Sequence, residues 1–432
     1  MQRRKQEQYV LIIIDGAGDV HRILERSPLT LARTNGMDFM ARHGFSGLMS
    51  TLYPDLPRGS LVAQLGIFGW APHEYYPSGR ASSELLALHQ IQLGANDLVF
   101  RANIVRMEDS VLTSYNADFI DSARSRRLVQ RINRELYALF PQFELYHNSD
   151  FRNTLVIRNA PVSACDIICA EPHESHGMTF DISRLVQTTT PTGEELVCSI
   201  NRYLVRVSEL LQKDTDYVLF PWGASNVFCL PSFCEHNQFE GRAAIVGNMD
   251  FLHGLAKAGQ IDFYKIGNGR PDTDYRGKGE MVLKCLVDGY DFVACHVNGP
   301  DEASHMYDVP LKITSIERTD EEIVLPVIEY FMEHRSRLGG IMVLPDHYTN
   351  TVPDASGRRI ESHSLHPVPF TVWNGRNVDD CRYFSEDEAA FGIYGAMPVS
   401  HLQALEILDV FGNGRKNIKE MTGVQSIYDR AA

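Results

Sequence analysis

The sequence predicts an α/β fold whose core is a mainly parallel sheet flanked by helices. Three short apolar runs have the composition of strands buried on both faces, and each is followed by a carboxylate. These runs are residues 9–14 before Asp15, residues 292–297 before Asp301, and residues 340–345 before Asp346. Between the second and third runs, residues 311–337 carry apolar side chains at helical spacing. Alternating strands and helices favour a parallel sheet.

The carboxylates that follow these strands are candidate metal ligands. In open parallel sheets, ligands bind outside the carboxyl ends of the strands, so we expect Asp15, Asp301 and Asp346 to converge there. An Asp-Gly pair after a strand is usually only a turn, and the hypothesis therefore depends on the set of residues.

Three histidines extend the candidate set. His305 lies four residues after Asp301, so one helical turn places both side chains on one face. His347 is adjacent to Asp346 in a predicted loop, where the two side chains can address different ions. His363 follows a polar loop at 354–361 and precedes residues 366–370, which we expect to form an edge strand because proline cannot donate to a central ladder.

The six candidates offer oxygen and nitrogen donors without thiolates. This set suits Zn²⁺ or Mn²⁺ better than Ca²⁺, with Mg²⁺ or Co²⁺ as further options, and two such ions about 3.5–4 Å apart suit phosphoryl transfer.

Ser60 is the candidate nucleophile. It follows a tight loop with Pro57 and Gly59 and opens a stretch of apolar residues at helical spacing. We expect it at a helix N-cap, for which serine is favoured without any chemistry. The alternative hypothesis is that Ser60 is a nucleophile: the backbone amides at such a position bind phosphate, and a nearby cation activates the hydroxyl.

Several motifs together resemble a known family. They are DGAGD at 15–19, PRGS at 57–60, SGRASSELLAL at 78–88, VFRANIV at 99–105, FPWGASN at 220–226, GNGRPDTDYRGKGE at 267–280, DEASH at 301–305, PDH at 345–347 and HSLHPVPF at 363–370. In order and spacing they resemble the archaeal-type cofactor-independent phosphoglycerate mutases of the alkaline phosphatase superfamily. Bacterial relatives labelled as proposed homoserine kinases share them.

The resemblance implies a mechanism and a set of site residues. One divalent metal would be held by Asp301, His305 and His363, and the other by Asp15, Ser60, Asp346 and His347. The serine would take the phosphate of a phosphoglycerate and return it to the other hydroxyl of glycerate, without 2,3-bisphosphoglycerate. This isomerase reaction, between 3-phosphoglycerate and 2-phosphoglycerate, belongs to glycolysis.

The resemblance also implies substrate-binding cations. The substrate is a small phosphorylated carboxylate, and arginine binds both of its anionic groups bidentately. Arg80, Arg101 and Arg152 lie in segments that match the family's substrate-binding region, and Lys278 matches its active-site lysine. We expect Arg101 and Lys278 to act in catalysis as well. A solvated surface charge is the ordinary reading of each.

Departures from the family pattern keep two other functions open. Leu61 follows Ser60 where relatives usually carry an acidic residue, and Asn153 stands where they often carry histidine. These differences favour a paralogous phosphatase or phosphotransferase that acts on another small phosphorylated hydroxy or amino acid. The third reading is a non-catalytic metal-binding or scaffold protein, which the intact Ser60 and ligand set disfavour.

Composition sets the broad class. With 432 residues and 44% hydrophobic content, the chain can bury a large core. A net charge of −14 disfavours nucleic acid and anionic membranes as partners. No apolar run approaches the ~20 residues of a membrane span. The eight cysteines lack CxxC spacing, as expected of reduced thiols in the cytoplasm. A homo-oligomer is left open.

The candidate ligands also predict the domain organisation. They come from both ends of the chain, and none lies between Ser60 and Asp301. We therefore expect a metal-binding core of residues 1–72 and 216–432 and an inserted α/β cap of residues 73–215 that carries the three arginines. Within the cap, residues 154–158 and 166–169 are strand-like, and residues 194–211 form an amphipathic helix.

Overall fold

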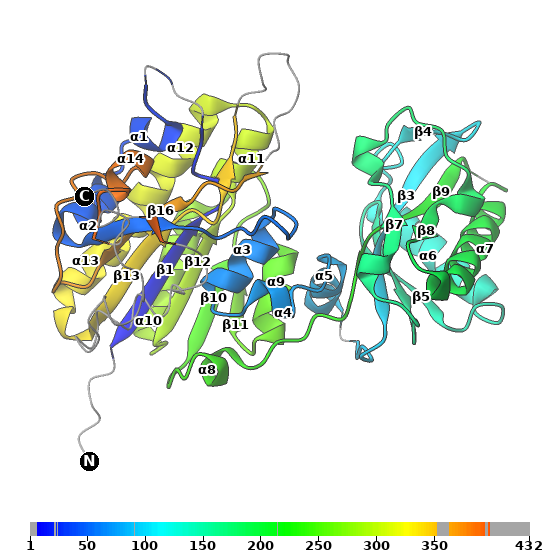
Figure 1. Ribbon diagram of the computed structural model, residues 1–432, viewed down its shortest axis with the longest axis horizontal. Coiled ribbons are helices and arrows are strands. Elements are labelled where there is room, and N and C mark those ends of the chain that lie inside the picture. The colour runs from blue at the N-terminus through cyan, green and yellow to red at the C-terminus, as the bar shows by residue number, and fades with distance from the viewer. Residues whose placement is uncertain are drawn as a thin grey trace, which may run out of the picture. The chain divides into compact units, whose positions relative to one another are not determined.

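The computed structural model describes residues 7–20, 23, 25–89, 91–213, 215–351, 363–393 and 396–397. The loop expected at 354–361 lies outside this range. The chain divides into two compact units (Figure 1). The larger contains residues 1–75, 230–249 and 259–432, and the smaller contains residues 76–229 and 250–258. No helix in the described part of the chain is long and apolar enough to cross a membrane.

The larger unit is built on one mostly parallel sheet, in the order β11-β10-β12-β1-β13-β16-β2-β17. Of these strands, only β16 runs against its neighbours β13 and β2. The strands are β1 (Gln8–Ile14), β2 (Phe45–Met49), β10 (Ala243–Gly247), β11 (Asp262–Lys265), β12 (Phe292–Val297), β13 (Leu338–Leu344), β16 (Val368–Trp373) and β17 (Ala396–Met397). The predicted fold class is confirmed.

Helices and a small hairpin complete this unit. The hairpin is β14 (Tyr348–Thr349) with β15 (His363–Ser364). The helices are α1 (Pro28–Leu31), α2 (Asn35–His43), α3 (Ser60–Ile67), α4 (Pro72–Tyr75), α8 (Phe233–His236), α10 (Tyr275–Val287), α11 (Gly299–His305), α12 (Val309–Thr319), the π-helical turn η5 (Asp320–Val324), α13 (Leu325–Glu333), the 3₁₀ turn η6 (Arg335–Arg337) and α14 (Glu386–Ala389).

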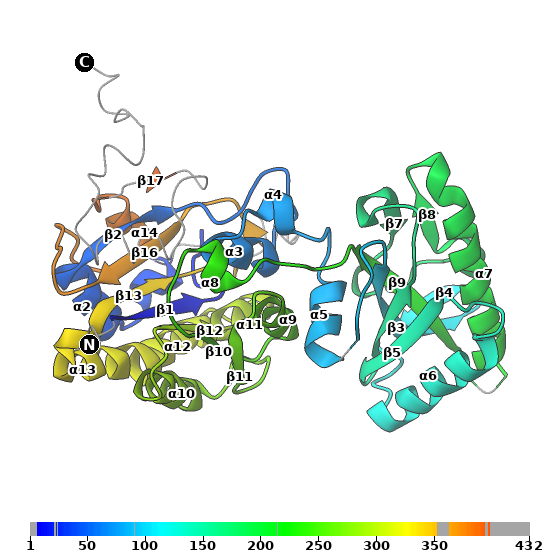
Figure 2. The same ribbon diagram turned by 90° about the horizontal axis from the view of Figure 1, so that it is seen from below.

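The two faces of the large sheet are covered by different helices. Figure 2 shows α10, α12 and α13 along one face. Val293, Cys295 and Val297 of β12 belong to the hydrophobic core that these helices share. Alternate residues of a strand point to opposite faces, and Phe292 accordingly packs against Phe68 and Phe233, which adjoin or belong to α3 and α8. The helix that begins at Ser60 therefore covers the opposite face from α10.

The edge-strand prediction for residues 366–370 is wrong. Strand β16 lies inside the sheet, between β13 and β2. Pro369 is tolerated there because it pairs only with Leu48 of β2, whereas pairing with β13 is confined to residues 371–373. The missing N–H of Pro369 therefore falls beyond the ladder with β13.

The smaller unit is built on a five-stranded antiparallel sheet, with β3 paired to β4, β6 and β9. The strands of this sheet are β3 (Leu98–Glu108), β4 (Val111–Ser114), β5 (Phe143–Ser149), β6 (Arg152–Ile157) and β9 (Tyr217–Ser225). A separate two-stranded sheet pairs β7 (Ile167–Cys169) with β8 (Val186–Thr188). The helices of the smaller unit are α5 (Ala81–Leu88), α6 (Ser122–Leu136), α7 (Glu194–Leu211) and α9 (Asp250–Ala258), with 3₁₀ turns η1 (Ala164–Asp166), η2 (Pro172–Glu174), η3 (Ile182–Arg184) and η4 (Pro191–Gly193).

The chain passes from the smaller unit back to the larger one at residues 229–230, later than the predicted boundary at 215–216. The sequence placed residues 216–229 in the core, but β9 pairs with β3 over residues 217–225 and belongs to the smaller unit. An apolar run in the sequence indicates that a strand is buried, but it does not indicate to which sheet the strand belongs. Helix α9 also belongs to this unit, because Lys257 Nζ donates to the carbonyls of Leu86 and Ala87.

A buried carboxylate replaces a local cap on α2. Thr34, at the N-cap of that helix, makes no capping bond. Instead, Asp320 of η5 accepts hydrogen bonds from the amides of Gly36 at 2.8 Å and Met37 at 2.7 Å. Burial raises the pKa of Asp320 to about 6, although those amide bonds oppose the shift.

This raised pKa predicts a pH-dependent stability difference. The folded state holds the Asp320 proton more tightly than the unfolded state between about pH 4 and pH 6. The wild type is therefore expected to gain free energy of unfolding relative to Asp320→Asn as the pH falls from about 7 to about 4, by up to about 3 kcal/mol. Urea denaturation of both proteins across this range measures the difference. A difference that stays constant, or that shrinks toward acid, would contradict the assignment.

Candidate active site

The carboxyl end of the large sheet gathers the carboxylates predicted from the strand ends. Strand β1 lies between β12 and β13 and runs parallel to both, so the residues that follow these strands emerge at one edge. Asp15 follows β1, Asp301 lies on α11 after β12, and Asp346 follows β13. The three residues are 2%, 8% and 0% exposed, which is unusual for carboxylates without a cationic partner.

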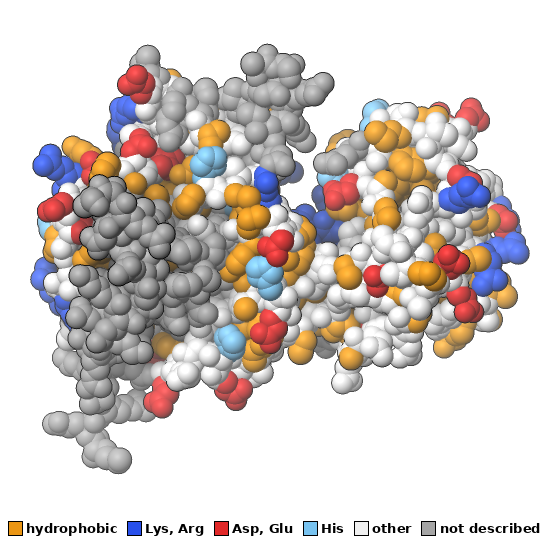
Figure 3. Space-filling model, viewed as in Figure 1, with side chains coloured by type: hydrophobic (Ala, Val, Ile, Leu, Met, Phe, Trp, Pro, Cys, Tyr) orange, Lys and Arg blue, Asp and Glu red, His pale blue; other side chains and the backbone are white. Residues whose placement is uncertain are grey.

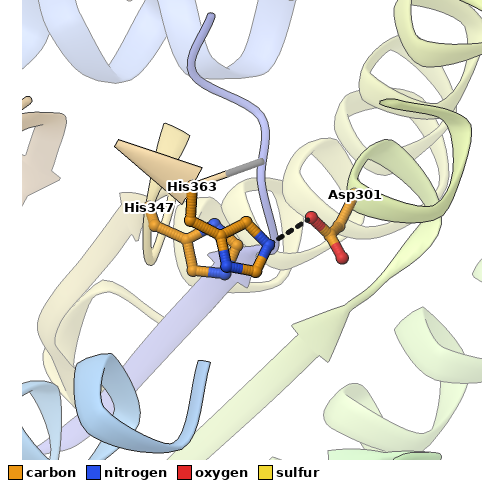
Figure 4. Close-up of side chains that lie close together, drawn as sticks. All are labelled: Asp301, His347 and His363. Carbon is orange, nitrogen blue, oxygen red and sulfur yellow. Dashed lines mark ion pairs between the residues drawn. The ribbon is translucent and has the colours of Figure 1, made fainter. Parts of the chain in front are cut away.

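Asp301, His347 and His363 form the first cluster of potential ligands (Figure 4). They offer ligand atoms within 4.8 Å of one another. His363 Nε2 is 3.6 Å from Asp301 Oδ1, and the rings of His363 and His347 stack with centroids 4.0 Å apart. The β14–β15 pairing, in which Thr349 lies opposite His363, positions that histidine. His305 Nε2 is 3.3 Å from Asp301 Oδ2, so the predicted helical turn does place the two together.

Asp15, His296 and Asp346 form the second cluster, again with ligand atoms within 4.8 Å. His296 Nε2 lies 3.3 Å from Asp15 Oδ2. His347 Nε2 lies 3.4 Å from Asp15 Oδ1 and therefore joins the two clusters. His296 is not among the ligands predicted from the sequence. Its signal was a lone histidine within the apolar strand β12, which is ordinarily read as a core residue.

Ser60 lies against the cluster residue His347, with its Oγ 3.1 Å from His347 Nε2. The predicted N-cap role is wrong. Ser60 is the first residue of α3, and Gly59, in an extended conformation, occupies the N-cap. The side chain of Ser60 is thus turned to the cluster and not to its own helix.

The charges of the cluster are strongly perturbed. Burial raises the pKa of Asp15 well above its ordinary value, and the neighbouring Asp346 and Asp301 raise it further. Burial lowers the pKa of His347 and of His296 to about 4, so both rings are neutral at neutral pH. Burial also opposes ionisation of Asp301, but the ion-pair contacts with the His305 and His363 rings outweigh it and hold its pKa well below the usual range.

The donor set fits divalent cations. Neutral imidazoles and carboxylates are the protonation states that bind metal. Asp15 Oδ1 and His363 Nε2 are both buried, and neither has a hydrogen-bond partner within the described residues. Buried carboxylates in such proximity are costly unless positive charge offsets them. Cations bound among them would satisfy both requirements.

Hydrogen bonds fix the orientation of Asp346. Its Oδ1 accepts from the amide of Gly16 at 3.2 Å, and its Oδ2 accepts from Gln64 Nε2 at 3.2 Å. Gly16 has a φ of +63°, and a Cβ there would lie 2.5 Å from Thr349 Oγ1 and 2.7 Å from Asp301 Oδ1. Only glycine therefore fits between these segments.

Thr349 bridges two residues of the first cluster through its buried hydroxyl. Thr349 Oγ1 donates to Asp301 Oδ1 at 2.6 Å, so at 3.1 Å it can only accept from His347 Nδ1. This places the imidazole proton on Nδ1 and leaves the Nε2 lone pair directed to Asp15 and Ser60.

Thr349→Val is expected to weaken metal binding roughly 10–100-fold, because the nearly isosteric side chain cannot hold either ligand. Competition with a chelator measures the effect. The control, Thr314→Val, removes an exposed hydroxyl that bonds only within α12. Unchanged affinity in Thr349→Val would exclude the link.

Lys278 lies beneath the second cluster and is fully buried. Its Nζ donates to the backbone carbonyl of His296 at 2.8 Å and to Asn248 Oδ1 at 3.2 Å. Burial lowers its pKa to about 8. The ammonium group therefore supports the end of β12 through the backbone.

The three predicted arginines lie in the smaller unit. Arg101 and Arg80 share one carboxylate, with Arg101 Nε 2.8 Å from Glu84 Oε2 and Arg80 Nε 3.3 Å from Glu84 Oε1. The charge of Arg101, followed by burial, lowers the pKa of Arg80. Arg152 stacks on Phe151, 4.3 Å from the ring centre to Cζ, and its charge also contributes to lowering the pKa of Glu84. Three guanidinium groups near two carboxylates, Glu84 and Glu171, leave an excess of positive charge.

A mostly parallel sheet with carboxylates, imidazoles and a serine at its carboxyl end defines a class of α/β enzymes that transfer phosphoryl groups at metal ions. Within this class, the chain belongs to the family of 2,3-bisphosphoglycerate-independent phosphoglycerate mutases. The family model of that description matches residues 41–215. A 2,3-bisphosphoglycerate-independent phosphoglycerate mutase from Methanothrix thermoacetophila is 30% identical over 417 residues, which cover 93% of this chain and 99% of the relative.

Solved structures share the fold. A protein from Pyrococcus horikoshii has a TM-score of 0.71 at 24% identity, covering 96% of this chain and 99% of that chain. A cofactor-independent phosphoglycerate mutase from Thermoplasma acidophilum has a TM-score of 0.61 at 22% identity, covering 94% of this chain and 100% of that chain.

Proposed function

We propose that this protein is a metal-dependent phosphoglycerate mutase that interconverts 3-phosphoglycerate and 2-phosphoglycerate through a phosphoserine at Ser60, without 2,3-bisphosphoglycerate. The observation that carries the proposal is the position of Ser60 Oγ, 3.1 Å from His347 Nε2, where the two ligand clusters join. A helix cap needs no such neighbour, whereas a nucleophile activated at a metal centre does.

Two ligand sets divide the cluster. One divalent ion would be held by Asp301, His305 and His363. The other would be held by Asp15, Ser60, Asp346 and His347. Mn²⁺ and Zn²⁺ suit these nitrogen and oxygen donors best. When bound, such ions neutralise phosphoryl oxygens and favour the ionised serine.

The protein's own residues account for the transfer. Ser60 Oγ attacks phosphorus, the Oγ–P bond forms, and the bond from phosphorus to the substrate oxygen breaks. The departing glycerate alkoxide takes up the proton that Ser60 gives up and becomes a hydroxyl. The other hydroxyl of glycerate then loses its proton as its oxygen attacks the phosphoserine; the Oγ–P bond breaks, and the proton returns to Ser60 Oγ. The N-terminus of α3, which Ser60 opens, presents backbone amides and a positive dipole end that favour an anion at this point.

Cationic side chains supply substrate recognition in this proposal. Arg80, Arg101 and Arg152 would bind the phosphate and carboxylate of the substrate, as guanidinium groups bind both bidentately. Arg101 would also act in the reaction itself. For Lys278, the contacts with His296 O and Asn248 favour a role in holding the ligand-bearing end of β12, close enough for Asp15 to influence its pKa.

The proposed partner is a small metabolite in the cytoplasm. In Figure 3, the basic and acidic side chains of the described residues are interspersed on the visible face of each unit, which does not favour a polyanionic partner. All eight cysteines are free, consistent with a reducing compartment.

One observation favours the alternative of a phosphatase or phosphotransferase on the same scaffold. Asn153 is buried, and its Oδ1 lies 2.9 Å from His147 Nδ1. The residue that departs from the family pattern is thus occupied within the smaller unit. An enzyme with altered substrate contacts would release inorganic phosphate or ignore phosphoglycerate.

The test is a coupled assay. Purified protein loaded with Mn²⁺, Zn²⁺, Co²⁺ or Mg²⁺ is given 3-phosphoglycerate, and 2-phosphoglycerate is followed through enolase. We expect turnover that does not need 2,3-bisphosphoglycerate and that disappears when the mutase is stripped of metal beforehand. The proposal fails if none of the four metals supports isomerisation.

A further inference from the structure

Lys312 of α12 is a fully buried lysine that the proposed mechanism does not use. Its ammonium group has three oxygen acceptors: Thr349 O at 2.8 Å, Gly18 O at 3.1 Å and Asp19 Oδ2 at 3.1 Å. An ammonium group has three N–H donors, so every one of them is matched. The lysine is held by a complete set of short contacts.

These acceptors belong to the segments that carry the proposed ligands. Gly18 lies three residues after Asp15, and Thr349 lies two residues after His347. The amide of Thr349 also donates to Gly18 O at 3.1 Å, so the two segments meet directly. Helix α12 itself follows α11, which carries Asp301 and His305. Three ligand-bearing segments therefore converge on the nitrogen of Lys312.

Thr349 passes this constraint on to the ligands. Lys312 holds its carbonyl, while its hydroxyl bridges Asp301 Oδ1 at 2.6 Å and His347 Nδ1 at 3.1 Å. A small shift of the Thr349 backbone would move the hydroxyl away from both ligands. We infer that Lys312 is a positioning residue that sets the geometry of both ligand clusters by fixing the backbone of Gly18 and Thr349. This inference rests on the proposed metal-dependent function.

Charge compensation of Asp19 is the simpler explanation, and it is insufficient. Asp19 Oδ2 also accepts from the hydroxyl of Thr351 at 2.7 Å and from its amide at 3.2 Å. A buried ion pair costs desolvation and can be replaced by uncharged residues without loss of stability. An apolar residue in place of the lysine cannot donate to the carbonyls of Gly18 and Thr349. The feature that only the lysine supplies is the link between the two backbones.

The experiment measures cobalt binding to the full chain. The variants are Lys312→Met and the double variant Lys312→Met/Asp19→Asn, which removes both members of the ion pair and carries the test if the single variant does not fold. Asp320→Asn is the matched control, because it alters another buried charge of the same unit, one that bonds only α2 amides among the contacts described. Affinity is measured by chelator competition, and geometry by the visible absorption spectrum of bound Co²⁺.

We expect both Lys312 variants to bind Co²⁺ roughly 10–100-fold more weakly than the wild type and to show an altered cobalt spectrum. Asp320→Asn is expected to keep the affinity and spectrum of the wild type, whatever its change in thermal stability. Wild-type affinity and spectrum in the double variant would overturn the inference and leave the proposed function standing. A wild type that binds no Co²⁺ would overturn the metal centre, and the inference with it.

Discussion

Ser60→Ala is expected to lower turnover of 3-phosphoglycerate by roughly 10⁴-fold or more, the range seen when an enzyme loses its nucleophile. Alanine cannot form the Oγ–P bond, so no phosphoenzyme accumulates. The fold should survive, because Gly59 occupies the N-cap and the serine hydroxyl supports no helix contact. The enolase-coupled rate and acid-quenched protein phosphorylation measure the two effects, and the melting temperature should change by less than about 2 °C.

The matched control for this variant is Ser122→Ala. Ser122 is also the first residue of a helix, α6, but its hydroxyl bonds to Asp150 in the smaller unit. This control should keep its turnover within about twofold, as expected for a partly exposed residue away from the ligand clusters. If Ser60→Ala keeps wild-type activity, the nucleophile is another residue.

Asp301→Asn is expected to remove one metal ion per chain. It should also lower the turnover of 3-phosphoglycerate by more than the roughly 100-fold associated with loss of an outer-shell partner. The Asp301 carboxylate lies within reach of His305, His363 and the hydroxyl of Thr349. Asparagine keeps the size but supplies one neutral oxygen. Metal content by elemental analysis and the enolase-coupled rate give the two readouts.

Glu302→Gln provides the comparison for Asp301→Asn. Glu302 is the next residue on α11 and is absent from both clusters of potential ligands. Its neutralisation should leave metal content unchanged. If Asp301→Asn retains two ions per chain with wild-type activity, Asp301 is not a ligand and the first ligand set must be redrawn.

Local patterns in the sequence predicted most of the elements that build the site. The amphipathic helix expected at 194–211 is α7, with the same bounds, because its apolar face has one periodicity throughout. The apolar runs before Asp15 and Asp346 are β1 and β13. The helical stretches between the strands predicted that the strands run parallel. Parallel strands bring the carboxylates that follow them to the same edge of the sheet.

Features that depend on tertiary partners were not predictable in this way. The proline-containing strand β16 lies inside the sheet because Pro369 falls beyond one ladder, a matter of register between distant segments. Strand β9 joins the smaller sheet through β3. His296 could not be predicted, because a lone histidine in an apolar strand does not indicate that the carboxylate of Asp15, after the neighbouring strand, lies beside it. The positions of Lys312 and Thr349 likewise depend on contacts between segments.

Phosphoryl transfer through Ser60 is tested most directly by following the phosphate with ³¹P NMR. Metal-loaded protein is incubated with 3-phosphoglycerate alone, without 2,3-bisphosphoglycerate. Phosphoryl transfer to and from Ser60 at the metal centre predicts that the 2-phosphoglycerate resonance grows at the expense of the 3-phosphoglycerate resonance, with little inorganic phosphate. Accumulation of inorganic phosphate without 2-phosphoglycerate, or a spectrum that never changes, would contradict the account.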